Sequence, residues 1–538
     1  MAELTKLTDR LGAHPAAQIV TRTSHGLMIR SFAQLREDVH QKVTELRHRG
    51  LDALMRVGVL ACNCYEWIVL DLALVSLRCE IVALTSAQLH GDLEAIAVEQ
   101  ELSTVLLVGN GTPISRFAHL EWVVAENARG PIPLRVGSPR QADPEWTAPF
   151  RVFSSGSTGT PRCISVPRAG MEQCIEELKE TYAFDASDTL LLFLPVANLQ
   201  QRFLVYAALW YGISLVVIEP IHLLPALKET APTILLAPPL FFETIARRVT
   251  GSLPLRWLIR MAARARTRRG RLLLWGRLAL APLRKRVFSE LGGRVRLMIT
   301  GMAPVGRATL EVYSALELPL FEAYGMTECG IIACNTPRTA RSGSVGHPVA
   351  GVRVELLPDG EITVQRRVPL TSGYVGIDPE VCAETYLGQG KVATGDLGWF
   401  DDEGFLHLMG RKKNVIVLGD GRKIHPEPVE RELISIPWVH QAALLPEGHS
   451  GLACVIHAAG QGSRFERAVR RELERIVWEH TGQGLGRVLF NKEPFTSQNG
   501  LLTQNLKLNR LALRRLLGSQ GATAAWKWEE SKNVIAPR

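Results

Sequence analysis

Residues 153–161 read Phe-Ser-Ser-Gly-Ser-Thr-Gly-Thr-Pro, and this stretch decides how the whole chain is interpreted. It combines serine and threonine hydroxyls with two glycines and contains no acidic residue. Glycine lets a backbone approach a ligand closely, and a concave set of N–H and hydroxyl donors suits a chain of phosphates. The Gly-Lys-Ser/Thr ending of a Walker A loop is missing. Alone, the stretch fits a phosphate-binding loop and a polar surface turn equally well.

The length and composition indicate a globular protein with several structural units. At 538 residues, with 46% apolar and 21% charged side chains, the chain has room for about two to four such units. Its longest apolar run, 203–218, is shorter than the ~20 residues of a membrane-spanning helix, and it contains Gly212 and Ser214. We therefore expect a buried helix there that runs into a strand.

The cysteines and the N-terminus indicate a cytoplasmic protein. None of the nine cysteines forms a Cys-x-x-Cys pair or lies at zinc-ligand spacing from a histidine. The first residues, Met-Ala-Glu-Leu-Thr-Lys, lack the basic and apolar regions of a signal peptide. We expect small buried or half-buried thiols in a reducing compartment.

The net charge of +9 is concentrated in one segment, 256–286. This segment holds eleven of the 62 Lys and Arg residues and no acid, while the rest of the chain carries about as many acids as bases. It is also rich in leucine and tryptophan, which predicts amphipathic helices within an insertion at about 252–290. Such helices fit a solvated basic face, a peripheral contact with an anionic membrane or an acidic partner. No DNA- or RNA-binding motif is present, and we expect no nucleic acid partner.

The order of apolar runs predicts an α/β fold. Strands and helices are expected to alternate in the pattern of parallel sheets covered by helices. From about residue 345 the pattern changes to hairpins, such as 352–364 with Pro-Asp-Gly at its turn and 398–408. We expect a large N-terminal domain, 1–409, which includes a β subdomain at about 345–409, and a small α+β C-terminal domain, 410–538. The expected strands and helices are Arg56–Ala61, Tyr65–Leu77, Glu80–Leu84, Leu93–Gln100, Thr104–Val108, Leu190–Leu194, Ser214–Ile218, Thr233–Leu236 and Arg296–Thr300.

Four further motifs carry chemistry that fits a nucleotide. In 323–328, Ala-Tyr-Gly-Met-Thr-Glu, an aromatic ring can stack on a purine, and a threonine beside a carboxylate can hold a phosphate and a hard metal ion. In 393–396, Ala-Thr-Gly-Asp at the end of a short strand, the carboxylate can accept both hydroxyls of a ribose. The others are the basic run 410–413 and the segment 501–510, which contains Lys507. Each of these motifs is weak by itself.

Together, in this order, the five motifs resemble those of the acyl-adenylate-forming superfamily, which contains acyl-CoA synthetases, peptide-synthetase adenylation domains and luciferases. The resemblance extends from about residue 30 to 515. It is most similar to the long-chain fatty acyl-CoA synthetases, because of Leu-Pro-Val-Ala-Asn at 194–198 followed by Arg202, the insertion before Leu291, and the segment 499–510.

The resemblance implies a two-step reaction. A carboxylate attacks the α-phosphate of ATP and releases pyrophosphate, and a thiol then attacks the acyl adenylate and releases AMP. Mg²⁺ and a mobile C-terminal domain, with Lys413 as the hinge, are implied as well. Arg162, Asp396 and Arg411 would bind the nucleotide, with Asp396 and Arg411 at the ribose. The other residues that the resemblance assigns are Ser154, Ser155, Gly156, Ser157, Thr158, Gly159 and Thr160 at the phosphates; Tyr324 at adenine; Thr327, Glu328 and Lys507 in catalysis, with Glu328 on the metal; and Asn198, Gly301 and Met302 in the acyl pocket.

Some positions depart from the family pattern. Arg162 and Cys163 replace the usual Lys-Gly after the loop, and arginine substitutes a planar fork for a compact ammonium group. Asn198 replaces a histidine, and Met302 replaces a glycine. Gln-Asn at 504–505 replaces Pro-Thr. We expect an active enzyme with an altered acyl pocket.

Three functions remain open at this point. The first is an acyl-CoA ligase for a fatty or related lipophilic acid. The second is an acyl-AMP ligase that loads an acyl carrier protein, which the basic segment 256–286 could dock. The third is a non-catalytic relative that binds a nucleotide or an acyl ligand.

Overall fold

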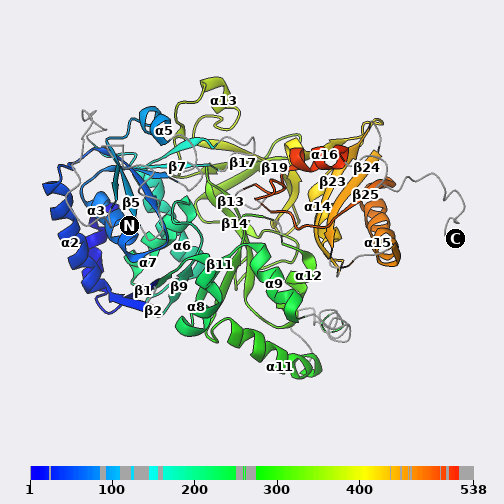
Figure 1. Cartoon of the computed structure of the whole chain (residues 1–538), viewed down its shortest axis with the longest axis horizontal. Helices are drawn as coiled ribbons and strands as arrows, with labels where there is room; N and C mark the ends of the chain where they lie inside the picture. Colours follow the sequence, from blue (N-terminus) through cyan, green and yellow to red (C-terminus); the bar gives the residue numbers. More distant parts are fainter. Residues whose placement is uncertain are drawn as a thin grey trace, which may run out of the picture.

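The protein is an α/β structure whose parts follow one another along the long axis of the molecule (Figure 1). The C-terminal unit lies at one end, and strands of the β subdomain lie between it and the N-terminal sheets. This computed structural model describes residues 2–23, 26–84, 93–108, 123–125, 145–154, 161–249, 259, 261, 274–303, 305–436, 438–448, 451–458, 460, 463–496, 498–503 and 508–519.

The first large sheet has the order β18-β8-β7-β4-β3-β5-β6 in the described part of the chain. Its strands β7, β4, β3, β5 and β6 run parallel, while β8 and β18 add antiparallel at one edge. The strands and helices expected between 56 and 108 are confirmed. The bounds are β3 Arg56–Ala61, α3 Tyr65–Ser76, β4 Glu80–Leu84, α5 Leu93–Glu99, β5 Thr104–Val108, β6 Val123–Ala125, β7 Phe150–Phe153, β8 Cys163–Val166 and β18 Gly373–Tyr374.

The second large sheet has the order β15-β14-β13-β12-β11-β9-β10-β1-β2. It is parallel from β1 to β13, and its central strands β9, β10, β11 and β12 are short, apolar and mostly buried because helices cover them. The apolar run 203–218 forms the end of α7 followed by β10, as expected. The strands are β1 Gln18–Thr23, β2 Gly26–Ser31, β9 Thr189–Leu192, β10 Ser214–Val217, β11 Ile234–Ala237, β12 Leu297–Thr300, β13 Leu320–Met326, β14 Gly330–Cys334 and β15 His347–Pro348.

The helices that pack on these sheets differ in how they begin and in how deeply they are buried. In α2, Ser31 and Gln34 form a reciprocal capping box. In α11, Leu280 and Val287 are buried while Leu278 is 67% exposed. Apart from α11 and two single residues, the basic insertion lies outside the described residues. The helix bounds are α2 Phe32–His48, α6 Arg168–Tyr182, α7 Leu199–Tyr211, α8 Leu223–Thr230, α9 Pro239–Val249, α11 Leu274–Glu290, α12 Arg307–Ala315 and α13 Pro379–Ala383.

The β subdomain is an antiparallel sheet, β16-β17-β19-β20, built from β16 Val352–Leu356, β17 Glu361–Arg366, β19 Lys391–Phe400 and β20 Leu406–Arg411. Both expected hairpins are present. One expectation is wrong, because Asp396 does not end a short strand but lies within the ten-residue strand β19. The strand continues because its pairing with β20 runs past Asp396, with a shift in register between Leu397 and Gly398.

The C-terminal part forms hydrophobic clusters of its own. Its sheet β23-β24-β25 packs against helices, and the two clusters there contain only residues after position 415. The domain boundary near residue 410 stays a prediction. Among the described helices of the whole chain, none combines the length and apolarity that crossing a bilayer requires. The bounds are β23 Val439–Glu447, β24 Gly451–Ala458, β25 Leu485–Asn491, α14 Pro426–Leu433, α15 Ser463–Thr481 and α16 Arg510–Ser519.

Candidate active site

Three of the predicted nucleotide-binding residues meet in one corner. The Tyr324 hydroxyl donates to Asp396 Oδ2 at 2.6 Å, and Arg411 Nε lies 2.8 Å from Asp396 Oδ1. Arg411 Nη1 also donates to the Thr394 carbonyl at 3.0 Å. The corner forms because Asp396 and Arg411 are partners in the β19–β20 register, while Tyr324 arrives from β13 in the neighbouring sheet.

The corner keeps its hydrogen-bonding pattern because it is buried. Tyr324 and Asp396 are each 8% exposed. Burial, and then the Asp396 charge, raise the pKa of Tyr324 well above its usual range, so that its hydroxyl stays protonated and can donate. A carboxylate has about four lone-pair sites, so Asp396 retains the capacity to accept from another hydroxyl. Stacking of the Tyr324 ring on adenine stays a prediction.

The predicted metal ligand, Glu328, is also buried and held in place. Tyr374 Oη donates to Glu328 Oε1 at 2.9 Å, and Thr371 Oγ1 donates to the Glu328 carbonyl at 2.6 Å. Within the described residues, these bonds leave Oε2 for a ligand. A carboxylate oxygen suits Mg²⁺, which retains several waters and phosphate oxygens in such sites. The described part of the chain holds no group of three or more metal-binding side chains. Thr327 is half-buried beside Glu328.

The phosphate loop is described at its two ends. Ser154 N–H donates to the Arg162 carbonyl at 2.8 Å, and Arg162 N–H donates to Ser154 Oγ at 3.4 Å. These bonds continue the antiparallel pairing of β7 with β8 and close the base of the loop. The residues predicted to hold the phosphates, Ser155, Gly156, Ser157, Thr158, Gly159 and Thr160, lie outside the described residues.

The two unusual residues after the loop have different environments. The Arg162 guanidinium lies over the ring of Tyr374, with Cζ 5.0 Å from the ring centroid. Cys163 is 3% exposed, and its Sγ lies 3.1 Å from Gln100 Oε1 in the core. Burial raises the pKa of Cys163 to about 12, so this thiol is not a nucleophile at neutral pH. Of these two residues, Cys163 belongs to the core, and nucleotide binding by Arg162 stays a prediction.

Two of the predicted acyl-pocket residues, Gly301 and Met302, directly follow β12, and the third, Asn198, directly precedes α7. Thr300 pairs with Glu322 in the β12–β13 register, and a Cβ on Gly301 would lie 2.8 Å from the Ala323 carbonyl. Met302 has φ of +69° and is 41% exposed. A left-handed conformation costs a non-glycine residue about 1–2 kcal/mol, and such strain clusters at functional sites. Asn198 is the residue that precedes α7.

The C-terminal residues are described less fully. Lys507 lies outside the described residues, as do Gln504 and Asn505. Lys413, the predicted hinge, lies in the short 3-10 helix Lys412–Asn414 directly after β20. Its role stays a prediction.

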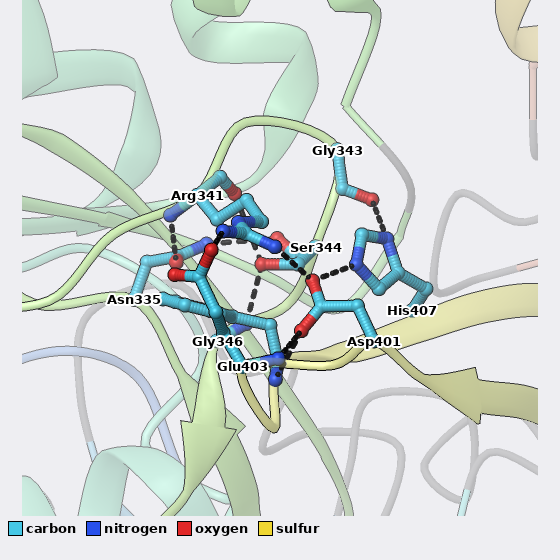
Figure 2. A network of polar contacts seen from close by, with 9 residues as sticks. Asn335, Arg341, Gly343, Ser344, Gly346, Asp401, Glu403 and His407 are labelled. Carbon is cyan, nitrogen blue, oxygen red and sulfur yellow. Dashed lines mark hydrogen bonds and ion pairs between the residues drawn. The ribbon is translucent and has the colours of Figure 1, made fainter. Parts of the chain in front are cut away.

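A polar network that the sequence analysis missed holds the β19–β20 hairpin against the chain that follows β14. Figure 2 shows Arg341 and His407 converging on Asp401. Arg341 Nη1 lies 2.6 Å from Asp401 Oδ2, and His407 Nε2 lies 2.9 Å from the same oxygen. His407 Nδ1 lies 3.1 Å from the Gly343 carbonyl, and Arg341 also pairs with Glu403. No local sequence signal predicts pairing over this separation.

The Asp401 carboxylate of this network stays ionised in the fold. Desolvation raises its pKa, but hydrogen bonds from His407, from the Phe405 amide and from Arg341 outweigh that effect and hold the pKa below its usual value. Since the same hairpin carries Asp396 and Arg411, the network ties the strands of the Tyr324–Asp396–Arg411 corner to the chain that follows β14.

The chain is similar to known proteins in both sequence and structure. The family model described as AMP-binding enzyme matches residues 9–386. The chain is 27% identical over 545 residues to long-chain-fatty-acid–CoA ligase 1 of Homo sapiens, covering 86% of this chain and 77% of that protein. It is 26% identical over 455 residues to long-chain-fatty-acid–CoA ligase FadD15 of Mycobacterium bovis, covering 76% and 73%. The ATP-bound structure of MatB from Rhodopseudomonas palustris superposes with a TM-score of 0.72 at 20% identity, covering 96% of this chain and 99% of that one.

Proposed function

The chain belongs to the AMP-binding enzyme family, and on this premise we propose that it is an AMP-forming acid–thiol ligase. In the first step, a carboxylate oxygen of the acid bonds to the α-phosphorus of ATP, and the bond to pyrophosphate breaks. In the second, a thiolate bonds to the acyl carbon, and the bond to AMP breaks. The observation that carries the proposal is the buried corner of Tyr324, Asp396 and Arg411. The strand of Tyr324 leads to Glu328, and Tyr374 contacts both Glu328 and Arg162 at the base of the phosphate loop.

The first step brings together two anions, the carboxylate and the triphosphate. It therefore requires positive charge and fixed dipoles aimed at the reacting phosphorus. The loop 154–160 and Arg162 would bind the terminal phosphates, and Lys507 would bridge the acid and the α-phosphate. Asp396 and Arg411 would hold the ribose, which fixes the rest of the nucleotide.

Mg²⁺ fits the carboxylate at Glu328. One oxygen is fixed by Tyr374, and the other is open to a ligand within the described residues. When bound, the ion would neutralise charge on the leaving pyrophosphate. Glu328, with Thr327 beside it, would hold the ion against the phosphates.

For the acid we propose a fatty or related lipophilic carboxylic acid. The support is the similarity to proteins named long-chain-fatty-acid–CoA ligases. Met302, where the family pattern has glycine, would narrow the pocket and restrict the acids that fit.

For the acceptor we propose CoA, as in those relatives' names. Loading of an acyl carrier protein is the second candidate, because α11 presents basic side chains to an acidic partner, among them Arg284 and Arg286.

Pyrophosphate release over a panel of acids, with CoA or carrier protein added, tests both. Acid-dependent pyrophosphate release followed by acyl-CoA supports the proposal. Acylation of the carrier protein, without formation of acyl-CoA, favours the second candidate. If no acid gives pyrophosphate release, the chain is a non-catalytic binder.

We also propose a cytoplasmic location with peripheral contact to an anionic membrane through 256–286. All nine cysteines lie within the described residues, and no disulfide joins them, as is usual in a reducing compartment. On α11, Leu278 is 67% exposed beside Arg277. The expected amphipathic pattern is wrong for α11, because its apolar and basic residues do not separate onto two faces. Glu317 partly offsets this charge, since it lies 3.1 Å from Arg277. Co-sedimentation with vesicles containing phosphatidylglycerol, but not with phosphatidylcholine alone, would support the contact.

A further inference from the structure

Tyr374, which no motif of the sequence analysis contained, lies between the two halves of the proposed ATP site. It belongs to β18, which pairs with β8 at the edge of the first sheet. That strand begins directly after Arg162, the closing residue of the phosphate loop. The Val375 amide donates to the Cys163 carbonyl at 2.9 Å, which fixes the backbone next to Tyr374.

The side chain of Tyr374 contacts two charged groups, one through its hydroxyl and one through the face of its ring. Its hydroxyl donates to Glu328 Oε1 at 2.9 Å, and the Arg162 guanidinium lies over its ring at 5.0 Å. The phenol thus contacts both a cation and a carboxylate.

Tyr386 packs against the ring of Tyr374, and Thr371 links Tyr386 to Glu328. The Tyr386 ring meets the Tyr374 ring edge-on, with centroids 5.2 Å apart and an interplanar angle of 82°. The Thr371 hydroxyl lies 3.0 Å from the Tyr386 hydroxyl and donates to the Glu328 carbonyl. The segment 371–386 therefore contacts both the Tyr374 ring and the backbone of Glu328.

We propose that Tyr374 is a positioning residue that couples Arg162 to Glu328. Without the phenol, the guanidinium and the carboxylate would be free to form a direct ion pair, and each would neutralise the other before ATP binds. With it, Arg162 stacks on the ring, as planar guanidinium groups do, and Glu328 keeps one oxygen fixed and one open to a metal ion. This inference rests on the proposed ATP-dependent function, because it assigns the two charges to a metal-bound triphosphate.

The test measures Mn²⁺ binding by electron paramagnetic resonance in the presence of α,β-methylene-ATP, which resists cleavage at the bond that the reaction breaks. Tyr374→Phe removes the hydroxyl and keeps the ring under Arg162, whereas Tyr374→Leu removes both. A matched control is Tyr211→Phe, because Tyr211 also donates to a glutamate, Glu176, at 2.9 Å and carries a cation over its ring, 4.4 Å from the centroid.

We expect Tyr374→Phe to raise the Mn²⁺ concentration at half-saturation about tenfold, the loss of one hydrogen bond to a charged group. Its affinity for the analogue without metal should stay at the wild-type value, and saturating Mg²⁺ should restore kcat for pyrophosphate release. Tyr374→Leu should weaken metal-free binding as well, since Arg162 loses its platform. Tyr211→Phe should match the wild type in every titration.

Wild-type Mn²⁺ affinity in Tyr374→Phe would overturn the coupling to Glu328. Equal metal-free affinities for Tyr374→Leu and Tyr374→Phe would overturn the coupling to Arg162. If the wild-type protein itself binds neither the analogue nor Mn²⁺, the proposed function fails, and the coupling fails with it.

Discussion

The Tyr324 hydroxyl donates to Asp396 Oδ2 at 2.6 Å, and this bond links β13 of the second large sheet to β19 of the β subdomain. The strand β13 leads to Thr327 and Glu328, and β19 leads towards β20 with Arg411. The groups proposed for adenine, ribose and metal are therefore joined through one buried contact.

Tyr324→Phe tests this link. The variant keeps the ring but removes a donor to a buried carboxylate, which is worth about 1.5–3 kcal/mol for a charged acceptor. We expect kcat/KM for ATP to fall by about tenfold or more, measured by pyrophosphate release. Tyr65→Phe, which removes a 2.6 Å bond to Asp38 elsewhere in the chain, is the control. Equal effects of the two substitutions would contradict a role for Tyr324 at the nucleotide.

Lys507→Ala tests the division of the reaction into two steps. Lysine is proposed to neutralise charge as the acid meets the α-phosphate, and the thiol step does not use it. We expect the adenylation half-reaction to be lost, while thioester formation from a supplied acyl adenylate remains near the wild-type rate. Lys412→Ala is the control for removing another lysine of the chain; its Nζ lies 2.6 Å from Asp359. Equal loss of both half-reactions in Lys507→Ala would rule out its assigned role.

Two substitutions of Met302 separate the effect of backbone strain from the effect of side-chain size. Met302→Gly removes both the bulk and the left-handed strain, whereas Met302→Ala removes only the bulk. We expect both variants to accept longer or bulkier acids. Only Met302→Gly should also gain stability, by roughly 0.5–1 kcal/mol. Thermal unfolding and an acid panel measure the two effects, and an unchanged acid profile in both variants would remove Met302 from the pocket.

The raised pKa of the Glu322 carboxyl should make the free energy of unfolding depend on pH. Burial raises its pKa from 4.5 to about 7, against the opposing effect of Arg431. The folded state therefore binds more protons than the unfolded state between these values, so the free energy of unfolding falls as pH rises from about 4.5 to 7. Relative to Glu322→Gln, we expect the wild type to lose roughly 2 kcal/mol over this window, measured by denaturant unfolding. The exposed Glu384→Gln should follow the wild-type profile, and identical profiles for all three would contradict the prediction.

Much of the fold was predictable from local patterns. Alternating apolar runs between 56 and 108 predicted β3, α3, β4, α5 and β5, because each strand is buried on both faces and each helix follows a turn. Pro-Asp-Gly predicted the β16–β17 turn, where Gly360 has φ of +85°. The length of β19 was not predictable, since its pairing depends on β20 and on a shift in register rather than on the residues around Asp396.

The sequence by itself supplied the candidate groups: a loop rich in serine, threonine and glycine, a tyrosine and a glutamate in one motif, and Asp396 and Arg411. Residue types at short spacing suggest each motif, and the order of the five motifs, which resembles that of the acyl-adenylate-forming superfamily, assigns them to one site. Only the tertiary structure decided that Tyr374 joins Arg162 to Glu328 and that Cys163 faces the core. Such contacts depend on strands that are distant in sequence lying side by side, and no local preference specifies which side chains then meet.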